Sequence, residues 1–245
     1  MIDWHLRFLQ QARWSAHLRA YLIQKAGIQP HHRLLEVGCG GGAVLQDFSA
    51  GSRIMGVDID FSSLVIARAL IPSALLLCSD GHKLPLSSES VDFTICHYFL
   101  MWVNGGEVLK EMRRITRRGG AVIAMAEPDY GGRIDHPPAL SNIGYYQTQS
   151  LRDQGADPTT GRKIRGWFRD AGLRNIESGV MSAQWSQDQP DPQELDMEWA
   201  VIRSDLSDYL APDEINALEK ADRHAWEEGT RILFVPTFYA IGYVP

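Results

Sequence analysis

The feature that most constrains this sequence is a glycine-rich turn that directly follows a short apolar segment. Residues 34–45 read LLEVGCGGGAVL, and one acid, Glu36, stands inside the apolar run just before the glycines. Glycine lets the backbone approach a ligand closely, and such turns after a strand commonly bind nucleotides. A carboxylate buried without a partner is costly. The segment therefore predicts a ligand that brings a positive charge to Glu36.

Apolar and amphipathic segments alternate from about residue 33 to 127. The apolar segments predict strands at 33–37, 53–60, 74–80, 91–100 and 121–127. Helices are expected between them, including one that begins at 43–48 and one that starts at a capping box of Asn104 and Glu107. Alternation of this kind predicts a parallel sheet flanked by helices.

Helices and two more strands are expected outside this region. The N-terminal segment from Trp4 to Ala26 predicts one amphipathic helix, and 141–151 predicts a short helix. Thr159 or Thr160 is expected to cap a further helix that ends at Gly172. Strands are predicted at 173–185 and 234–244, and two helices that start at Pro192 and Pro212 fill the stretch between them.

Charge and cysteine content limit the classes of partner. The 24 basic and 30 acidic residues give a net charge of -6, which argues against nucleic acid as a partner. Cys39, Cys78 and Cys96 show no zinc-binding spacing and are expected to be reduced and buried, which suits a cytoplasmic protein. Neither a signal peptide nor a membrane-spanning segment is expected. The sequence leaves the oligomeric state open, and a homodimer is compatible with it.

Two nucleotide cofactors fit the glycine turn differently. Gly38, Gly40 and Ala43 satisfy the G-x-G-x-x-G/A pattern of dinucleotide-binding dehydrogenases. That pattern does not explain Glu36, because NAD offers no ammonium near the turn. S-adenosylmethionine carries both an ammonium and a cationic sulfonium, so an acid beside the turn has an electrostatic purpose.

Four stretches in order resemble the class I S-adenosylmethionine-dependent methyltransferases, close to the type 11 and ubiquinone/menaquinone groups. They are LLEVGCGGG, VDID, CSDGHKLPL and ESVDFTICHYFL, and the resemblance covers roughly 30–127, 160–185 and 231–243. It implies a doubly wound, seven-stranded, mostly parallel Rossmann-like α/β sheet whose last strand is antiparallel. It further implies that an acid on the second strand takes the ribose hydroxyls and an acid on the third meets the adenine amine. The residues that it assigns to the cofactor are Glu36, Gly38, Cys39, Gly40, Asp58, Ile59, Asp80, Gly81 and His97.

The acceptor side of the expected site is less defined. His97 lies at the carboxyl edge of the sheet, where it is either a general base or a pocket wall, and Glu127 is a candidate catalytic or substrate-anchoring acid. No metal is expected, because the metal-dependent catechol subtype places an acid at the tip of strand four and this chain does not. The aromatic residues of the covering segments favour a planar or apolar small-molecule acceptor.

Residues 1–245 are expected to form one methyltransferase domain. Residues 1–30 are expected to form a helical cover, 30–127 the cofactor-binding core, and 128–160 with 186–230 the helical lid that shapes the acceptor pocket. The expected reaction is direct methyl transfer that leaves S-adenosylhomocysteine. Two alternatives remain: a protein that binds these cofactors without transferase activity, and a nicotinamide dehydrogenase, which Glu36 disfavours.

Overall fold

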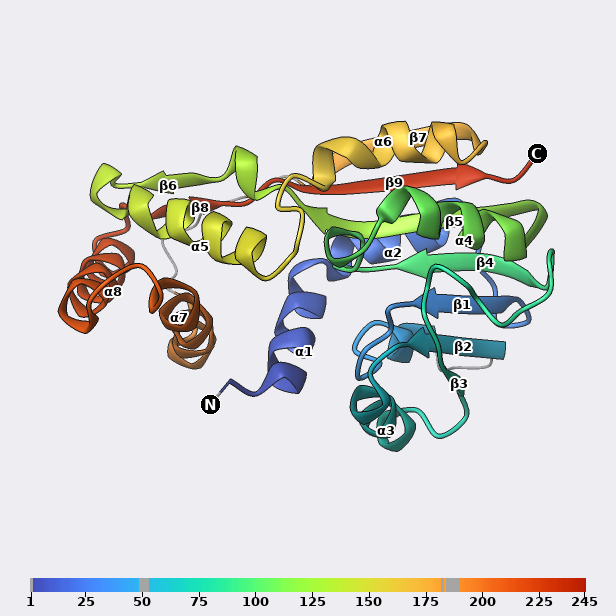
Figure 1. The fold of residues 1–245 in the computed structure, drawn as a ribbon, viewed down its shortest axis with the longest axis horizontal. Coiled ribbons are helices and arrows are strands. Elements are labelled where there is room, and N and C mark those ends of the chain that lie inside the picture. The colour runs from blue at the N-terminus through green and yellow to red at the C-terminus, as the bar shows by residue number, and fades with distance from the viewer. Residues whose placement is uncertain (1, 49–52, 182, 184–189) are drawn as a thin grey trace.

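The fold is built on a single seven-stranded sheet, and the computed structural model describes residues 2–48, 53–181, 183 and 190–245 (Figure 1). The strand order is β3-β2-β1-β4-β5-β9-β7. Strand β9 runs antiparallel to both β5 and β7, whereas β3, β2, β1, β4 and β5 pair in parallel. The predicted fold class is confirmed. The strands are β1 (Arg33–Val37), β2 (Arg53–Asp58), β3 (Leu75–Cys78), β4 (Val91–Cys96), β5 (Thr116–Pro128), β7 (Arg174–Met181) and β9 (Thr237–Tyr243).

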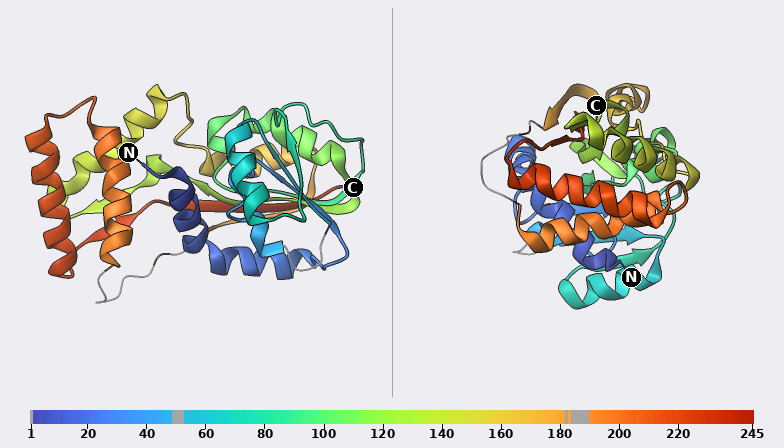
Figure 2. Two further views of the ribbon diagram at one scale, coloured as in Figure 1. Left: turned by 90° about the horizontal axis from the view of Figure 1, so that it is seen from below. Right: turned by 90° about the vertical axis from the view of Figure 1, so that its left-hand side faces the viewer.

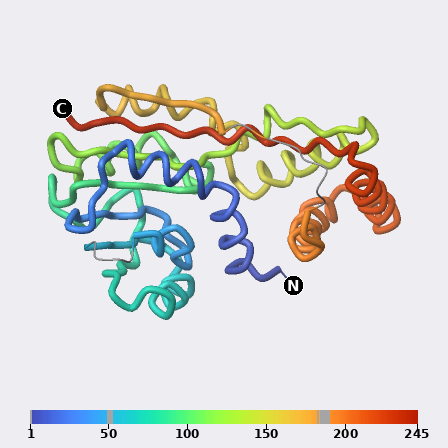
Figure 3. The backbone as a smooth tube through the Cα atoms, turned by 180° about the vertical axis from the view of Figure 1, so that it is seen from behind, coloured from blue at the N-terminus to red at the C-terminus, as the bar shows by residue number. Residues whose placement is uncertain are grey.

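Helices cover both faces of this sheet, as a doubly wound fold requires. Helices α4 (Gly105–Ile115) and α6 (Ile164–Asp170) lie together on one face, and α2 (Ala16–Ala26) crosses the other (Figures 1 and 3). Helix α3 (Phe61–Leu70) follows β2 and packs beside β3. Single 3-10 turns complete the connections: η1 (Leu45–Phe48), η2 (Leu100–Trp102), η3 (Tyr130–Gly132), η4 (Pro138–Leu140) and η5 (Gly161–Lys163).

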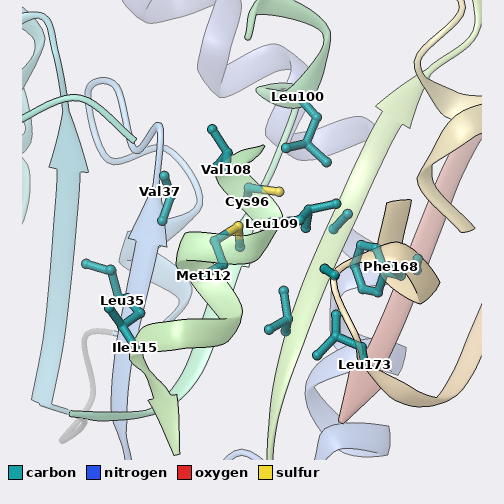
Figure 4. Packing of buried hydrophobic residues seen from close by; sticks show 14 of the residues in the cluster. Leu35, Val37, Cys96, Leu100, Val108, Leu109, Met112, Ile115, Phe168 and Leu173 are labelled. Atoms are coloured by element: carbon teal, nitrogen blue, oxygen red, sulfur yellow. The ribbon is translucent and has the colours of Figure 1, made fainter. Parts of the chain in front are cut away.

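The larger core forms between the sheet and the α4–α6 pair. Helix α4 presents apolar residues at helical spacing, and this face meets the parallel strands, whose side chains are buried on both sides (Figure 4). Aromatic and aliphatic residues of α6 and of the segment after it complete the cluster. The labelled members are Leu35, Val37, Cys96, Leu100, Val108, Leu109, Met112, Ile115, Phe168 and Leu173.

A second group of elements, here called the helical lobe, stands beyond the carboxyl edge of the sheet. It has its own apolar core, in which Trp199 and Leu206 are fully buried. Helix α1 (Trp4–Trp14) lies between this lobe and the sheet (Figures 1 and 2). The lobe consists of β6 (Ile134–His136), α5 (Ser141–Asp153), α7 (Pro192–Leu206), α8 (Pro212–Glu227) and β8 (Ile232–Phe234).

Three helix predictions were wrong in detail. The N-terminal helix is broken at Ser15 into α1 and α2, and the Ser15 hydroxyl lies near the carbonyls of Gln11 and Ala12. The predicted helix start at 43–48 is only the turn η1, preceded by Gly42 at φ +82°, outside the right-handed helical region. Helix α4 is confirmed, but its capping box does not form, because the Asn104 side chain makes no cap bond.

The C-terminal strand predictions were correct in place but not in extent. Strand β7 ends at Met181, and the rest of the predicted 173–185 strand includes residues outside the described part. The segment 234–244 divides into the end of β8 and β9, because β8 leaves the main sheet to pair with β6. Neither Thr159 nor Thr160 supplies a side-chain cap to α6, whose N-cap position is Lys163.

The burial predicted for the cysteines is also corrected at one position. Cys39 and Cys96 are buried, but Cys78 is exposed, because β3 is an edge strand of the sheet and Cys78 is its last residue.

Among the described residues, no helix is long and apolar enough to cross a membrane. The same part of the chain holds no cluster of three or more His, Cys, Asp or Glu residues suited to a metal ion.

The packing of α4 on the sheet gives a first prediction. Replacing the fully buried Leu109 by alanine should lower the free energy of unfolding by about 2–5 kcal/mol, because the cavity left behind adds to the lost burial. Urea denaturation measures this change. Lys110→Ala, on the exposed side of the same helix, should change it by less than about 0.5 kcal/mol. Equal effects of the two substitutions would contradict the packing described.

Candidate active site

The glycine turn is fixed by neighbouring strands. The backbone N–H groups of Gly38 and Cys39 both donate to the carbonyl of Val57, at 2.8 and 3.1 Å. Gly38 has φ +71°, and a Cβ built on it would stand 2.2 Å from Cδ2 of Phe99. Any larger residue at this position would therefore be strained and would collide with the Phe99 ring. The turn after β1 and the tip of β4 depend on each other.

Glu36 is the most unusual side chain of the turn. It is 2% exposed, and its Oε2 atom is buried without a hydrogen-bond partner among the described residues. Burial raises the pKa of Glu36 well above its usual value, and the nearby guanidinium of Arg19 only partly opposes this effect. An unpaired buried carboxylate is expensive to maintain, so the geometry suits a site that receives a cation.

Asp58, the acid at the end of the second strand, binds two backbone N–H groups. Oδ2 of Asp58 accepts a hydrogen bond from the Gly40 N–H at 2.7 Å, and Oδ1 accepts one from the Asp60 N–H at 2.9 Å. Asp60 in turn caps α3 through the N–H groups of Ser62 and Ser63. Ile59, between the two acids, is 73% exposed. Asp58 thus ties the glycine turn to the start of α3.

The acid of the third strand lies at the surface of the same edge. Oδ1 of Asp80 accepts from the backbone N–H of His82 at 2.8 Å, which together with the His82 side chain lowers the pKa of Asp80. Its Oδ2 atom makes no hydrogen bond within the described residues. Gly81, next to it, is buried against Val37 and Phe99, 3.1 and 3.2 Å from where a Cβ would stand. The structure therefore brings Glu36, Cys39, Asp58 and Asp80 to one edge of the sheet, as predicted.

His97 is held by the joint between α1 and α2. Its Nε2 atom lies 2.7 Å from the Ser15 hydroxyl oxygen, which accepts a hydrogen bond from Arg19 Nη1 at 2.8 Å. Burial lowers the pKa of His97 to about 3, and the Arg19 charge adds to this effect. His97 is therefore neutral at physiological pH.

The Glu127 side chain accepts hydrogen bonds from backbone N–H groups. It is fully buried, and its two oxygens accept hydrogen bonds from the N–H groups of Phe99 and Leu100, at 3.2 and 3.0 Å. These bonds hold the first residues of η2 at the tip of β4. Burial raises the pKa of Glu127 to about 8, although the backbone donors act in the opposite direction.

A cavity of about 330 Å³ lies between the sheet edge, α1 and the helical lobe. Tyr98 and Pro128 line it from the sheet, Trp14 from α1, and Leu195 and Trp226 from the lobe. Tyr98 has φ +51°, a left-handed conformation that is rare for an aromatic residue and is often found at functional sites. The lobe cavity therefore borders the same strand tips that hold the glycine turn.

Helix α1 faces both sites. Phe8 lies 3.7 Å from the position of a Cβ on Gly40, and His5 Nδ1 lies 2.9 Å from that of Gly41, so this side covers the glycine turn. Arg7, Gln10, Gln11 and Trp14 line the lobe cavity on its other side. Sequence reasoning assigned α1 to a cover but did not single out Arg7, Gln10 or Gln11. It also missed Ser15 and Arg19, which belong to no recognisable motif, and it assigned no role to Tyr98 within the fourth-strand stretch.

The burial of Glu127 predicts a pH dependence of stability. The folded protein keeps this proton up to about pH 8, whereas the unfolded chain releases it near the ordinary value of 4.5. Its contribution to the unfolding free energy therefore falls as the pH rises from 4.5 to 8, by at most about 1.4 kcal/mol per unit. Urea titrations should show that the unfolding free energy of the parent falls more between pH 5.5 and 8.5 than that of Glu127→Gln does. A difference that stays constant with pH would contradict the assignment.

Comparisons with known proteins agree with this geometry. The family model described as "Methyltransferase domain" matches residues 35–124, which run from β1 into β5. The malonyl-[acyl-carrier protein] O-methyltransferase of Hamiltonella defensa subsp. Acyrthosiphon pisum (strain 5AT) is 28% identical over 104 residues, 42% of this chain and 40% of that protein. The enzyme of the same name from Pseudescherichia vulneris is 30% identical over 115 residues, 46% of this chain and 45% of that protein. The matched segment thus spans less than half the length of these relatives.

A solved structure extends the likeness of fold to most of the chain. A putative methyltransferase from Bacillus halodurans C-125 superposes with a TM-score of 0.62 at 14% identity, and the match covers 92% of this chain and 98% of that one. The sheet order, the matched domain and these relatives agree with one another. Residues 35–124 match the methyltransferase-domain family, and the chain as a whole shares the fold of the class I S-adenosylmethionine-dependent methyltransferases, so these findings support a methyltransferase of that class.

Proposed function

We propose that this protein transfers a methyl group from S-adenosylmethionine to a small-molecule acceptor held in the lobe cavity. The observation that carries the proposal is the buried, unpaired oxygen of Glu36 beside a glycine turn at the carboxyl edge of the sheet. Open α/β sheets bind ligands at this edge. The match to the methyltransferase-domain family supports the identity of the cofactor, and the cavity beside the edge supplies room for an acceptor.

The residues present fit the cofactor. Glu36 would meet its ammonium group, and the backbone of Gly38, Cys39 and Gly40 would approach it closely. Asp58 would take the ribose hydroxyls while it keeps the Gly40 N–H, and Ile59 would pack on the nucleoside. The unengaged Oδ2 of Asp80 would accept from the adenine amine, next to the backbone of Gly81. Every one of these groups lies at one end of three neighbouring strands.

The proposed reaction requires the protein mainly to position the acceptor against the methyl group. The cofactor, when bound, supplies an electrophilic methyl group on its sulfonium. The chain's own residues would orient the acceptor in the cavity and exclude water from the reacting atoms, which for well-oriented reactants contributes about 7–11 kcal/mol. Helix α1 suits this task, because it contacts the glycine turn on one side and the cavity on the other.

Two residues take supporting roles in this proposal. His97 acts as a neutral wall residue and not as a base, because its Nε2 atom contacts the Ser15 hydroxyl and burial lowers the pKa of the ring. Glu127 acts as a positioning residue, because its oxygens hold the N–H groups of Phe99 and Leu100. Neither role requires a metal.

The lobe is proposed as the substrate-binding part of a single methyltransferase domain. Residues 128–160 and 186–230 were expected to form a lid, and α5, α7 and α8 fall within these ranges. The acceptor named for the two curated relatives, a malonyl group on a carrier protein, is not carried over, because the matches span less than half of those proteins and the family-model match ends at residue 124, before the lobe begins. The residues that shape the cavity here are this chain's own.

Calorimetry and mass spectrometry test the proposed function. The purified protein should bind S-adenosylhomocysteine and should not bind NAD, because only the former brings an ammonium to Glu36. Incubation with methyl-deuterated S-adenosylmethionine and a panel of small molecules should then give a labelled product. Tight cofactor binding with no transfer to any compound would favour a binding protein without transferase activity. Preference for NAD would refute the proposal.

The raised pKa of Glu36 predicts that cofactor affinity depends on pH. An ammonium beside the carboxyl favours its ionised form, so binding releases a proton and the affinity for S-adenosylhomocysteine should rise as the pH rises above the ordinary glutamate value of 4.5, by at most about tenfold per unit. Glu36→Gln should bind more weakly and with a flat profile in calorimetry. Glu107→Gln, on the exposed side of α4, should retain the parent's profile. An unchanged slope in Glu36→Gln would remove Glu36 from the site.

A further inference from the structure

We propose that the lobe cavity selects an uncharged, ring-shaped, largely apolar acceptor and rejects acidic and cationic ones. This inference rests on the proposed function, because it takes the cavity as the acceptor site. It is carried by the pairing of the charged side chains in the cavity wall.

The three guanidinium groups that line the cavity are already paired within the protein. Arg7 is bound to Glu198 and to Gln10, and its whole residue is only 5% exposed. Arg133 makes two bonds to Asp135, at 2.7 and 3.1 Å. A ligand carboxylate would therefore have to displace a protein carboxylate from one of these arginines, at the cost of leaving that carboxylate without a partner.

The third guanidinium is the most enclosed. The side chain of Arg231 is 1% exposed and binds Asp222 at 2.6 Å and Asp135 at 2.7 Å. The second oxygen of Asp222 accepts from the Trp199 indole at 2.9 Å. This part of the wall is thus a closed network of ion pairs and hydrogen bonds with no group left for a ligand.

Each carboxylate in the wall also has a cationic partner. Glu194 is paired with Arg13, Glu198 with Arg7, and Asp222 with Arg231. The lining contains three guanidiniums and three carboxylates, so these six side chains together carry no net charge, and each has a partner of opposite charge, in the lining or just behind it. A cationic acceptor entering the cavity would meet no unpaired anion among the described residues, and its desolvation would be uncompensated.

The rest of the wall is aromatic and uncharged. Trp14, Tyr98, Tyr130, Trp226 and Phe234 line the space, which favours flat ring compounds that stack on them. The side chains of Tyr130 and Gln11 make no hydrogen bond within the described residues, so they can bind one or two neutral polar groups. A volume of about 330 Å³ lies at the lower end of ligand pockets, roughly 300–1,000 Å³, and fits one compact ring system.

Matched ligands test the preference for neutral compounds. Calorimetry should show that 2-naphthol binds at least about tenfold more tightly than 2-naphthoate or 2-naphthylmethylammonium, which share its ring system. The three compounds are measured with and without saturating S-adenosylhomocysteine. Equal or tighter binding of either charged compound, or no binding of 2-naphthol in either condition, would overturn the inference.

A single substitution should alter the preference in a defined direction. Glu198→Gln frees the guanidinium of Arg7, so the affinity for 2-naphthoate should rise about tenfold while that for 2-naphthol stays within about threefold. Glu219→Gln is the control, because its partners Arg203 and Arg223 do not line the cavity. No gain of 2-naphthoate binding in a folded Glu198→Gln protein would contradict the pairing argument.

The outcome separates this inference from the proposed function. Failure of S-adenosylhomocysteine to bind would refute the transferase proposal, while the ligand series without cofactor would still test the cavity. Normal cofactor binding together with a preference for the charged compounds would refute only the acceptor class.

Discussion

The contact between Phe99 and Gly38 is the constraint on which the site depends. The ring occupies the space that any side chain at position 38 would need, so the tip of β4 can close onto the turn after β1 only because that residue is glycine. Glu127 fixes the other half of this contact by binding the N–H groups of Phe99 and Leu100. Asp58 and Val57 hold the turn from β2. These contacts hold the ends of β1, β2, β4 and β5 together around the glycine turn.

The elements that sequence reasoning predicted well are those whose signal is local. Parallel strands buried on both faces read as continuous apolar runs, which is why β1, β2, β4 and β5 were located, and proline at the first helical position located α7 and α8. The acids Asp58 and Asp80 at the strand ends were assigned by the resemblance to a family. The seven-stranded order itself came from the resemblance to a family.

The elements that were missed depend on contacts between distant residues. The break at Ser15 is stabilised by His97 and Arg19, and nothing in the local sequence distinguishes it from a continuous helix. Strand β6 exists because β8, nearly one hundred residues away, pairs with it. Residue type could not assign roles to His97 and Glu127, because both suit catalysis, and the contacts on which the proposed roles rest come from residues distant in sequence. The cavity is assembled from five separate parts of the chain.

Three consecutive residues at the tip of β4 serve three different neighbours. His97 contacts Ser15, Tyr98 lines the lobe cavity from a left-handed backbone conformation, and Phe99 lies on the glycine turn. An insertion or deletion here would shift all three side chains by one position and disrupt every neighbour at once. The lobe has no such constraint, because its loops and helix faces can change in length or sequence while the strand tip keeps its three contacts.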